Sequence, residues 1–218
     1  PRERLIATIT NNFVPCNGRF PILITLATIF IAGTNVFSSL YATLAVMGVI
    51  VFGVWITLFI SKLLSKTILK GLPSSFTLEL PPYRKPQIGR IIVHSIFDRT
   101  LFVLGRAITV AAPAGLVIWV MANIFVDGSS LLSHGAAFLQ PLGSALGMDG
   151  YILMAFILGF PANEIVIPII IMSYMSTGIM LELDSMVALK TLLTANGWTW
   201  LTAINVMIFT LMHFPCGT

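Results

Sequence analysis

Residues 20–61 form an uninterrupted stretch without a charged side chain, and this stretch limits what the chain can fold into. A helix crosses the hydrocarbon core of a bilayer in about 20 apolar residues, so the stretch is too long for a single crossing. Gly33, Thr34 and Asn35 divide it with residues that favour a turn. We therefore expect a transmembrane hairpin with its turn near Gly33.

The composition extends this conclusion to the whole chain. Of its 218 residues, 57% are hydrophobic and 9% are charged, which lies far outside the range of soluble domains. At about 20 residues for each span, this length allows roughly five or six crossings. The expected fold class is all-α, a polytopic transmembrane helical bundle with broken or re-entrant helices. The chain begins without Met and ends inside an apolar run, so we expect a piece of a longer protein.

The basic residues gather in one interval of the chain. Eight of the twelve Lys and Arg residues lie in it or at its edge, namely Lys62, Lys66, Lys70, Arg84, Lys85, Arg90, Arg99 and Arg106. Short cytoplasmic loops carry such an excess, so we place residues 61–100 in the cytoplasm. Basic loops of this kind serve topology and lipid head groups, which argues against nucleic acid as a partner.

Two different structures are expected within this basic interval. Residues 71–87 contain four prolines, which deny them a continuous helix, and we expect them to be extended. Residues 87–100 interleave isoleucines with basic side chains and are predicted to form an amphipathic helix at the membrane interface. His94 is expected at the surface of that helix.

The second half of the chain is predicted to begin with a third span over residues 107–126, kinked at Pro113 and closed by residues 127–130. Residues 131–148 have apolar runs too short to cross a bilayer. They are expected to form a re-entrant or interfacial segment. Helix pairing through the small residues Gly143 and Gly147 is an equal alternative.

A broken helix is predicted over residues 151–174, because Pro161 lies in its middle and Pro168 follows two turns later. Glu182, Asp184 and Lys190 then indicate a polar surface segment. Trp198 and Trp200 are expected to anchor the start of a last span at the interface, and this span reaches residues 213–216.

Glu164 is the strongest single indication of function. A carboxylate near the middle of a bilayer costs several kcal/mol unless it faces a cavity, a partner or a cation. Pro161 and Pro168 each free a backbone carbonyl, as in the discontinuous helices of transporters. We therefore assign Glu164 and the adjacent Asn163 to a cation pathway. The alternative is a carboxyl group that is protonated, or paired with a base, for packing alone.

A repeated Pro-Cys sequence is the second indication. Cys16 follows Pro15 near the start, and Cys216 follows Pro215 at the end, close to His213. Thiolates and imidazoles suit borderline and soft transition metals, so Cys16, Cys216 and His213, with Glu164, are candidate transient metal ligands. Free cysteine is also a common small buried hydrophobe, and both interpretations stay open.

Two further kinds of chemistry were considered. The ten methionines could offer a thioether path for copper(I), but methionine is also an ordinary filler of apolar helices. The zinc-protease H-E-x-x-H, the nucleophile-elbow G-x-S-x-G and the phosphate-binding G-x-x-x-x-G-K-[ST] sequences are missing. We therefore expect a transporter segment that is not itself an enzyme and does not hydrolyse nucleotides.

Five short motifs in order resemble a known family. These are Phe13-Val14-Pro15-Cys16-Asn17-Gly18-Arg19, an apolar hairpin, Leu80-Pro81-Pro82-Tyr83-Arg84, Phe102-Val103-Leu104-Gly105-Arg106-Ala107 and His213-Phe214-Pro215-Cys216. Their order over nearly the whole chain resembles the C-terminal membrane region of FeoB-type ferrous-iron transporters.

This resemblance implies a multi-pass importer of Fe²⁺ in the bacterial plasma (inner) membrane, with the gate cysteines as candidates for lining the ion path. It also implies a cytoplasmic G domain that binds GTP and Mg²⁺ outside this chain. Residues 1–19 would be the tail of a first gate repeat and residues 20–60 a family-specific hairpin. Residues 61–100 would be the basic cytoplasmic loop and residues 101–218 a second gate domain.

The partners implied are ferrous iron, the lipid bilayer, the protein's own G domain and its first gate repeat. A small Feo accessory protein and a second copy of the chain are further candidates. Two competing functions remain, a gate-fold carrier of a small organic solute such as a nucleoside, and a non-transporting membrane scaffold. A buried carboxylate in a broken helix argues against the scaffold, because a scaffold gains nothing from it.

Overall fold

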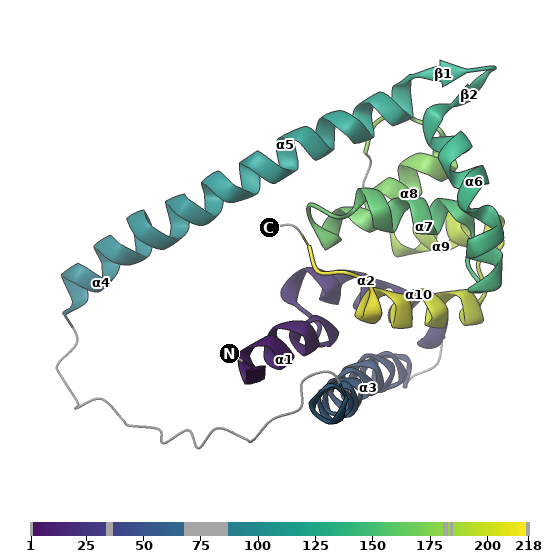
Figure 1. The fold of residues 1–218 in the computed structure, drawn as a ribbon. Coiled ribbons are helices and arrows are strands. Elements are labelled where there is room, and N and C mark those ends of the chain that lie inside the picture. Colours follow the sequence, from purple (N-terminus) through teal and green to yellow (C-terminus); the bar gives the residue numbers. More distant parts are fainter. Residues whose placement is uncertain (1, 34–36, 68–86, 181–182, 184, 217–218) are drawn as a thin grey trace.

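A computed structural model of the chain describes residues 2–33, 37–67, 87–180, 183 and 185–216. These residues are almost entirely helical (Figure 1), so the predicted fold class is confirmed. The extended stretch predicted within residues 71–86 lies outside the described residues, as do Glu182 and Asp184. Three helical stretches are long and apolar enough to cross a membrane, and two sharply bent helix pairs could add two more.

The first span is assembled from short helical pieces. They are α1 (Arg2–Thr10), the 3₁₀ turns η1 (Asn11–Phe13) and η2 (Asn17–Arg19), α2 (Phe20–Leu26) and the π-helical η3 (Ala27–Ile31). Pro15 separates η1 from η2, because it has no N–H to continue a helix. Together Glu3–Ile31 could span a bilayer. This span begins well before Phe20, where the sequence placed its start, and it therefore contains the first Pro-Cys break.

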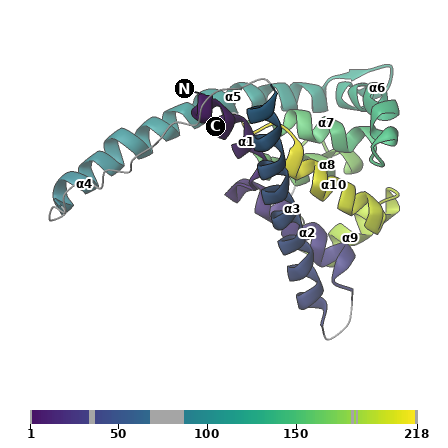
Figure 2. The same ribbon diagram turned by 60° about the horizontal axis from the view of Figure 1, so that its bottom comes forward.

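The second span, α3 (Ser38–Lys66), runs back along the first. Gly33 starts the turn between them with a φ of +63°, a value that glycine adopts without steric cost. The two helical arms pack against each other, as the predicted hairpin requires. α3 packs against η3 and α1, and α10 packs against both arms of the hairpin (Figure 2).

A single long helix projects from the rest of the molecule (Figure 1). It consists of α4 (Ile88–His94), the π-helical η4 (Ser95–Leu101) and α5 (Phe102–Asn123). A separate amphipathic helix followed by a new span was predicted here, and that separation is wrong. The π segment widens the helix without ending it, and α5 also continues through Pro113. His94 is exposed, as expected.

The long helix exceeds the membrane's apolar thickness. At 1.5 Å for each residue, its 36 residues extend about 54 Å, against a hydrocarbon core of about 30 Å. Strands β1 (Phe125–Val126) and β2 (Ser129–Ser130) then form a small hairpin. Asp127 and Gly128 make its two-residue turn with φ values of 51° and 81°. Helix α5 itself ends at Asn123, three residues before the predicted end of the span.

Two helix pairs are sharply bent. α6 (Leu131–Ala145) meets α7 (Gly150–Leu158) at 111°, and α9 (Met186–Ala195) meets α10 (Trp200–Met212) at 104°. Each bend could be a broken span or a re-entrant loop. The first of them covers the segment for which a re-entrant structure was predicted.

Both bends use the same local chemistry. Gly147 and Gly197 adopt φ values of +70° and +83° after the first helix ends. Two residues later Asp149 and Thr199 cap the next helix, with side-chain oxygens that accept from Ile152 N and Thr202 N. The bends therefore follow from a glycine stop and a polar start placed two residues apart.

Close backbone contact holds α6 against α7. A Cβ atom on Gly150 would lie 1.9 Å from the carbonyl oxygen of Ala136, and one on Gly143 would lie 2.8 Å from Asp149 C. Only glycine permits such an approach. Gly143 therefore serves helix packing, as the alternative prediction held, whereas Gly147 shapes the bend.

The predicted break in residues 151–174 is confirmed. α7 ends at Leu158, the 3₁₀ turn η5 (Asn163–Ile165) follows, and α8 (Val166–Met175) continues the path. Pro168, however, lies in the first turn of α8, where backbone N–H groups have no partner within the helix. It therefore adds no second break, which corrects the prediction that it would free another carbonyl.

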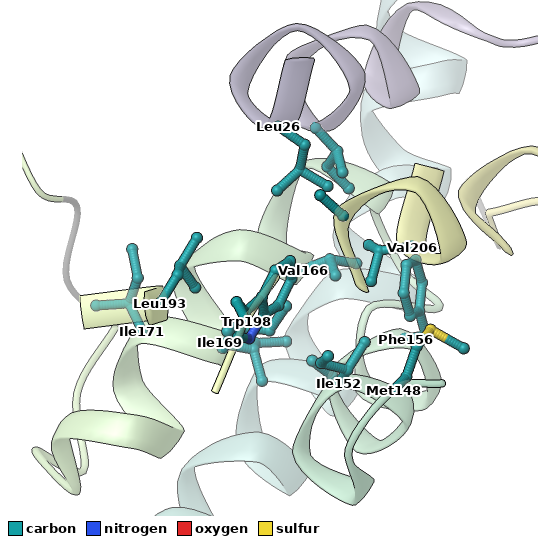
Figure 3. Packing of buried hydrophobic residues seen from close by; sticks show 14 of the residues in the cluster. Leu26, Met148, Ile152, Phe156, Val166, Ile169, Ile171, Leu193, Trp198 and Val206 are labelled. Carbon is teal, nitrogen blue, oxygen red and sulfur yellow. The ribbon is translucent and has the colours of Figure 1, made fainter. Parts of the chain in front are cut away.

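The hydrophobic core lies where α2, α7, α8 and α10 meet (Figure 3). Trp198 is part of it and only 4% exposed, so its predicted role as an interface anchor is wrong, whereas Trp200 is 63% exposed. The Trp198 indole donates to Tyr174 Oη at 2.8 Å, and Tyr174 donates to the Asp149 carboxylate. This chain of hydrogen bonds ties the two bends together. The methionines Met154, Met172 and Met207 are packed in the same core.

Candidate functional site

Three interruptions of helical structure, far apart in the sequence, meet at one place. They are residues 11–19 before α2, η5 between α7 and α8, and residues 213–216 after α10. Turns η2 and η5 are in contact, and the Asn12 side-chain amide donates to the His213 carbonyl oxygen at 2.8 Å. Irregular backbone at membrane depth is tolerated where protein or a water-filled cavity surrounds it.

Asn163 lies at the centre of this junction and is only 3% exposed. Its Nδ2 donates to Cys16 Sγ at 3.8 Å, and its Oδ1 lies 3.1 Å from His213 Nε2. One side chain in η5 therefore contacts both of the other interruptions. The sequence named Asn163 only as a neighbour of Glu164, but the structure makes it the link between Cys16 and His213.

His213 ends α10 and is buried. Its Nδ1 lies 2.8 Å from Thr210 O and 3.3 Å from Phe209 O. These contacts orient the ring with Nε2 toward Asn163. A neutral imidazole has one N–H, so it donates either to these backbone carbonyls or to Asn163 Oδ1. Stacking with Phe209 and a tilted contact with Phe156 hold the same orientation.

Glu164 is exposed, and its carboxylate lies beside Gly18. Its Oε1 is 3.4 Å from the point where a Cβ on Gly18 would be, so the missing side chain leaves room for the carboxylate next to the first break. The sequence predicted a buried carboxylate at a helix break. The structure places Glu164 at the break, beside the Pro-Cys segment around Cys16, but leaves its side chain exposed.

Both cysteines are free thiols, Cys16 exposed and Cys216 half-buried. The Arg19 guanidinium donates to Asn12 before the first Pro-Cys pair and to His213 and Phe214 before the second, which places the two Pro-Cys segments around one side chain. Over the described part of the chain, no three His, Cys, Asp or Glu side chains come close enough together to hold a metal ion. The candidate ligands therefore surround the junction without forming a closed cage.

Arg19 is the residue that sequence reasoning missed. It is 2% exposed. Nη1 donates to Asn12 O at 2.6 Å and Leu211 O at 3.2 Å. Nη2 donates to Asn12 Oδ1 at 3.2 Å, His213 O at 3.1 Å and Phe214 O at 3.3 Å. Its Nε is buried without a hydrogen-bond partner. A lone charge directly before a long uncharged run was the available signal, since charges at membrane depth are usually functional.

The end of α10 explains how this buried cation is stabilised. The last carbonyl groups of a helix lack partners within it and carry the negative end of the helix dipole. Arg19 binds one of them at Leu211 and two more just beyond the helix. A guanidinium with several donors in a fixed plane suits such a group of acceptors.

Two family models match the chain. "Ferrous iron transport protein B C terminus" matches residues 46–98, and the Gate model, "Nucleoside recognition", matches residues 104–218. No solved structure matches.

The curated relatives it matches carry the name Fe(2+) transporter FeoB. The protein of Staphylococcus aureus strain COL is 28% identical over 99% of this chain and 31% of its own length. That of Methanocaldococcus jannaschii is 24% identical over 99% of this chain and 32% of its own length. The protein of Helicobacter pylori strain 26695 is 24% identical over 76% of this chain and 31% of its own length. The chain spans about a third of the length of these relatives. It therefore belongs to the Gate family, and over residues 46–98 and in its curated relatives it is similar to the C-terminal part of FeoB proteins.

Proposed function

We propose that this chain forms the C-terminal part of the ion pathway of a ferrous-iron importer in the bacterial plasma membrane. The observation that carries the proposal is the meeting of three helix interruptions, which brings Cys16, Asn163, Glu164 and His213 around one junction. Cys216 belongs to the segment that Arg19 binds at the same place. The name of the curated relatives supports iron(II) as the cargo.

The side chains at the junction suit passage rather than storage of a metal ion. Glu164 offers a hard anionic oxygen, whereas Cys16 and Cys216 offer softer sulfur ligands to a borderline cation. Conduction requires binding that is weak enough for release. We assign the first contacts with the ion to Glu164 and Cys16, which are exposed, and an orienting role to Asn163.

The remaining parts of the full-length protein follow from the same proposal. Residues 1–19 would end a first gate repeat, residues 20–60 form the hairpin, residues 61–100 lie in the cytoplasm and residues 101–218 form a second gate domain. We assign GTP and Mg²⁺ binding to a G domain outside this chain, which has no phosphate-binding loop motif. A Feo accessory protein and a second copy of the chain remain candidate partners.

Loss of both thiols should slow iron uptake. In the full-length protein in vesicles, we expect the Cys16→Ser, Cys216→Ser double variant to take up Fe²⁺ several-fold more slowly, with the amount of protein unchanged, because serine is similar in size but a poor ligand for borderline metals. In the single variants, we expect a larger change in how strongly Mn²⁺ and Zn²⁺ compete with Fe²⁺ than in the rate of Fe²⁺ uptake itself. Normal rate and selectivity in the double variant would leave the cysteines with a packing role only.

The alternative cargo is a nucleoside, favoured by the description of the Gate model. A nucleoside carrier would be indifferent to the loss of both thiols and would take up labelled nucleoside. The same vesicles therefore decide between the two cargoes.

A cysteine at Lys66 should be labelled only from the cytoplasmic side. Lys66 is exposed at the end of α3, next to the interval that carries most of the basic residues. The test uses a membrane-impermeant maleimide on intact cells and on inside-out vesicles, in a variant with Cys16 and Cys216 replaced. Ser75, inside the basic loop, should behave in the same way although it lies outside the described residues. Labelling in intact cells would reverse the assigned topology.

A further inference from the structure

Among the lysines and arginines whose side chains the structure describes, Arg19 alone is buried. All five oxygens that accept from it are carbonyl oxygens, which carry no formal charge. None of the described carboxylates pairs with it. The guanidinium thus binds a group of carbonyl oxygens at helix breaks. In transporters, such carbonyl oxygens at helix breaks coordinate the transported cation.

These oxygens come from two segments that are far apart in the sequence. Asn12 supplies two of them, and Leu211, His213 and Phe214 supply the others. Asn12 and His213 each directly precede a phenylalanine, four residues before Cys16 and three residues before Cys216 respectively. Arg19 binds the carbonyl oxygen of both, and Asn12 also donates directly to His213 O.

We propose that Arg19 is a positioning residue that clamps the C-terminal Pro-Cys segment to the N-terminal one, so that Cys16 and Cys216 face the same space. Residues 213–216 follow the end of α10 and have no secondary structure of their own. Arg19 donates to the carbonyl oxygens of both His213 and Phe214 in this segment. The clamp rests on the proposed function, because it explains how the pathway's two thiols are brought together, but it makes a prediction that needs no transport.

The clamp also requires arginine in particular. Five acceptors on two sides can be reached by the planar fork of a guanidinium, whereas a lysine ammonium is a point donor with three hydrogens. Glutamine removes the charge and most of the donors. The contact between the two Pro-Cys segments should therefore weaken stepwise when Arg19 is replaced by lysine and then by glutamine.

The test measures how fast Cys16 and Cys216 are joined by a short bifunctional maleimide. It uses the full-length protein in membranes, with cysteines outside this chain replaced by serine, and identifies the linked peptides by mass spectrometry. Joining within one molecule reports effective concentration, so we expect Arg19→Gln to slow it by about tenfold or more and Arg19→Lys by a smaller factor. Arg106→Gln, which alters an exposed arginine on α5, should leave the rate unchanged.

An unchanged rate in folded Arg19→Gln would overturn the clamp. If that variant does not fold, Arg19→Lys decides, and a rate equal to that of the parent protein would then overturn it. Iron uptake separates this inference from the proposed function. Slower joining in the Arg19 variants together with normal uptake in the double serine variant keeps the clamp and removes the thiols from the pathway. Unchanged joining in the Arg19 variants together with impaired uptake in the double serine variant would overturn the clamp and keep the thiols in the pathway.

Discussion

Glu164→Gln is expected to lower Fe²⁺ uptake by the full-length protein by about a hundredfold, with the amount of folded protein unchanged. The substitution keeps the shape of the side chain and removes the negative charge next to Gly18 at the junction. A hundredfold loss corresponds to about 2.7 kcal/mol, which is in the range of one lost hydrogen-bonded interaction with a charged group. Initial rates of ⁵⁵Fe uptake into vesicles, normalised to folded protein, measure it.

Asp127→Asn provides the control for this charge effect. Asp127 is also an exposed carboxylate, but it lies in the turn between β1 and β2, and asparagine tolerates its φ of 51°. Its uptake should equal that of the parent protein. Normal uptake by Glu164→Gln, or an equal loss in both variants, would contradict the role assigned to Glu164.

Gly53→Ala is expected to destabilise the protein by about 1–3 kcal/mol and to impair transport as well. The new Cβ atom would lie 2.6 Å from the backbone oxygen of Phe13 and 3.1 Å from the Leu211 side chain. Backbone at the first break cannot move aside without disturbing Asn12, which Arg19 holds. Helix α3 must therefore shift away from the junction. Thermal unfolding of the purified protein in detergent should show the lower midpoint.

The matched control lies on the same helix. Gly48 has nothing within 4 Å of the position of an added Cβ, so Gly48→Ala should be neutral or stabilise α3 by up to about 1 kcal/mol. The two variants share the chemical change and differ only in what the methyl group meets. Equal unfolding midpoints for Gly53→Ala and Gly48→Ala would show that α3 does not pack on the first break as the structure has it.

The sequence by itself determined the features that depend on local residue chemistry. The uncharged run over residues 20–61 required a hairpin, and Gly33 located its turn. Pro161 located the break in the second half, and Asp127 and Gly128 located the turn that follows the long helix. The resemblance to FeoB proteins also followed from short motifs read in order, and the family models bear it out.

Helix continuity was harder to predict from the sequence. Basic residues over 87–100 suggested a separate interfacial helix, yet nothing there stops a helix, and a π segment carries it into α5. Pro168 was read as a second break because its place within a helix was unknown. In the first turn a proline costs no hydrogen bond, so the consequence of the residue depends on where the helix begins.

Only the tertiary structure decided which residues meet. Trp198 and Trp200 are two residues apart, yet one completes the core and the other faces outward, because the bend before α10 turns Trp198 toward Tyr174. Arg19 showed no partner in the sequence, since its acceptors are carbonyl oxygens, which every residue has, and most lie near 200 positions away. Backbone acceptors leave no trace in residue type, so a site built on them is visible only when the chain is folded.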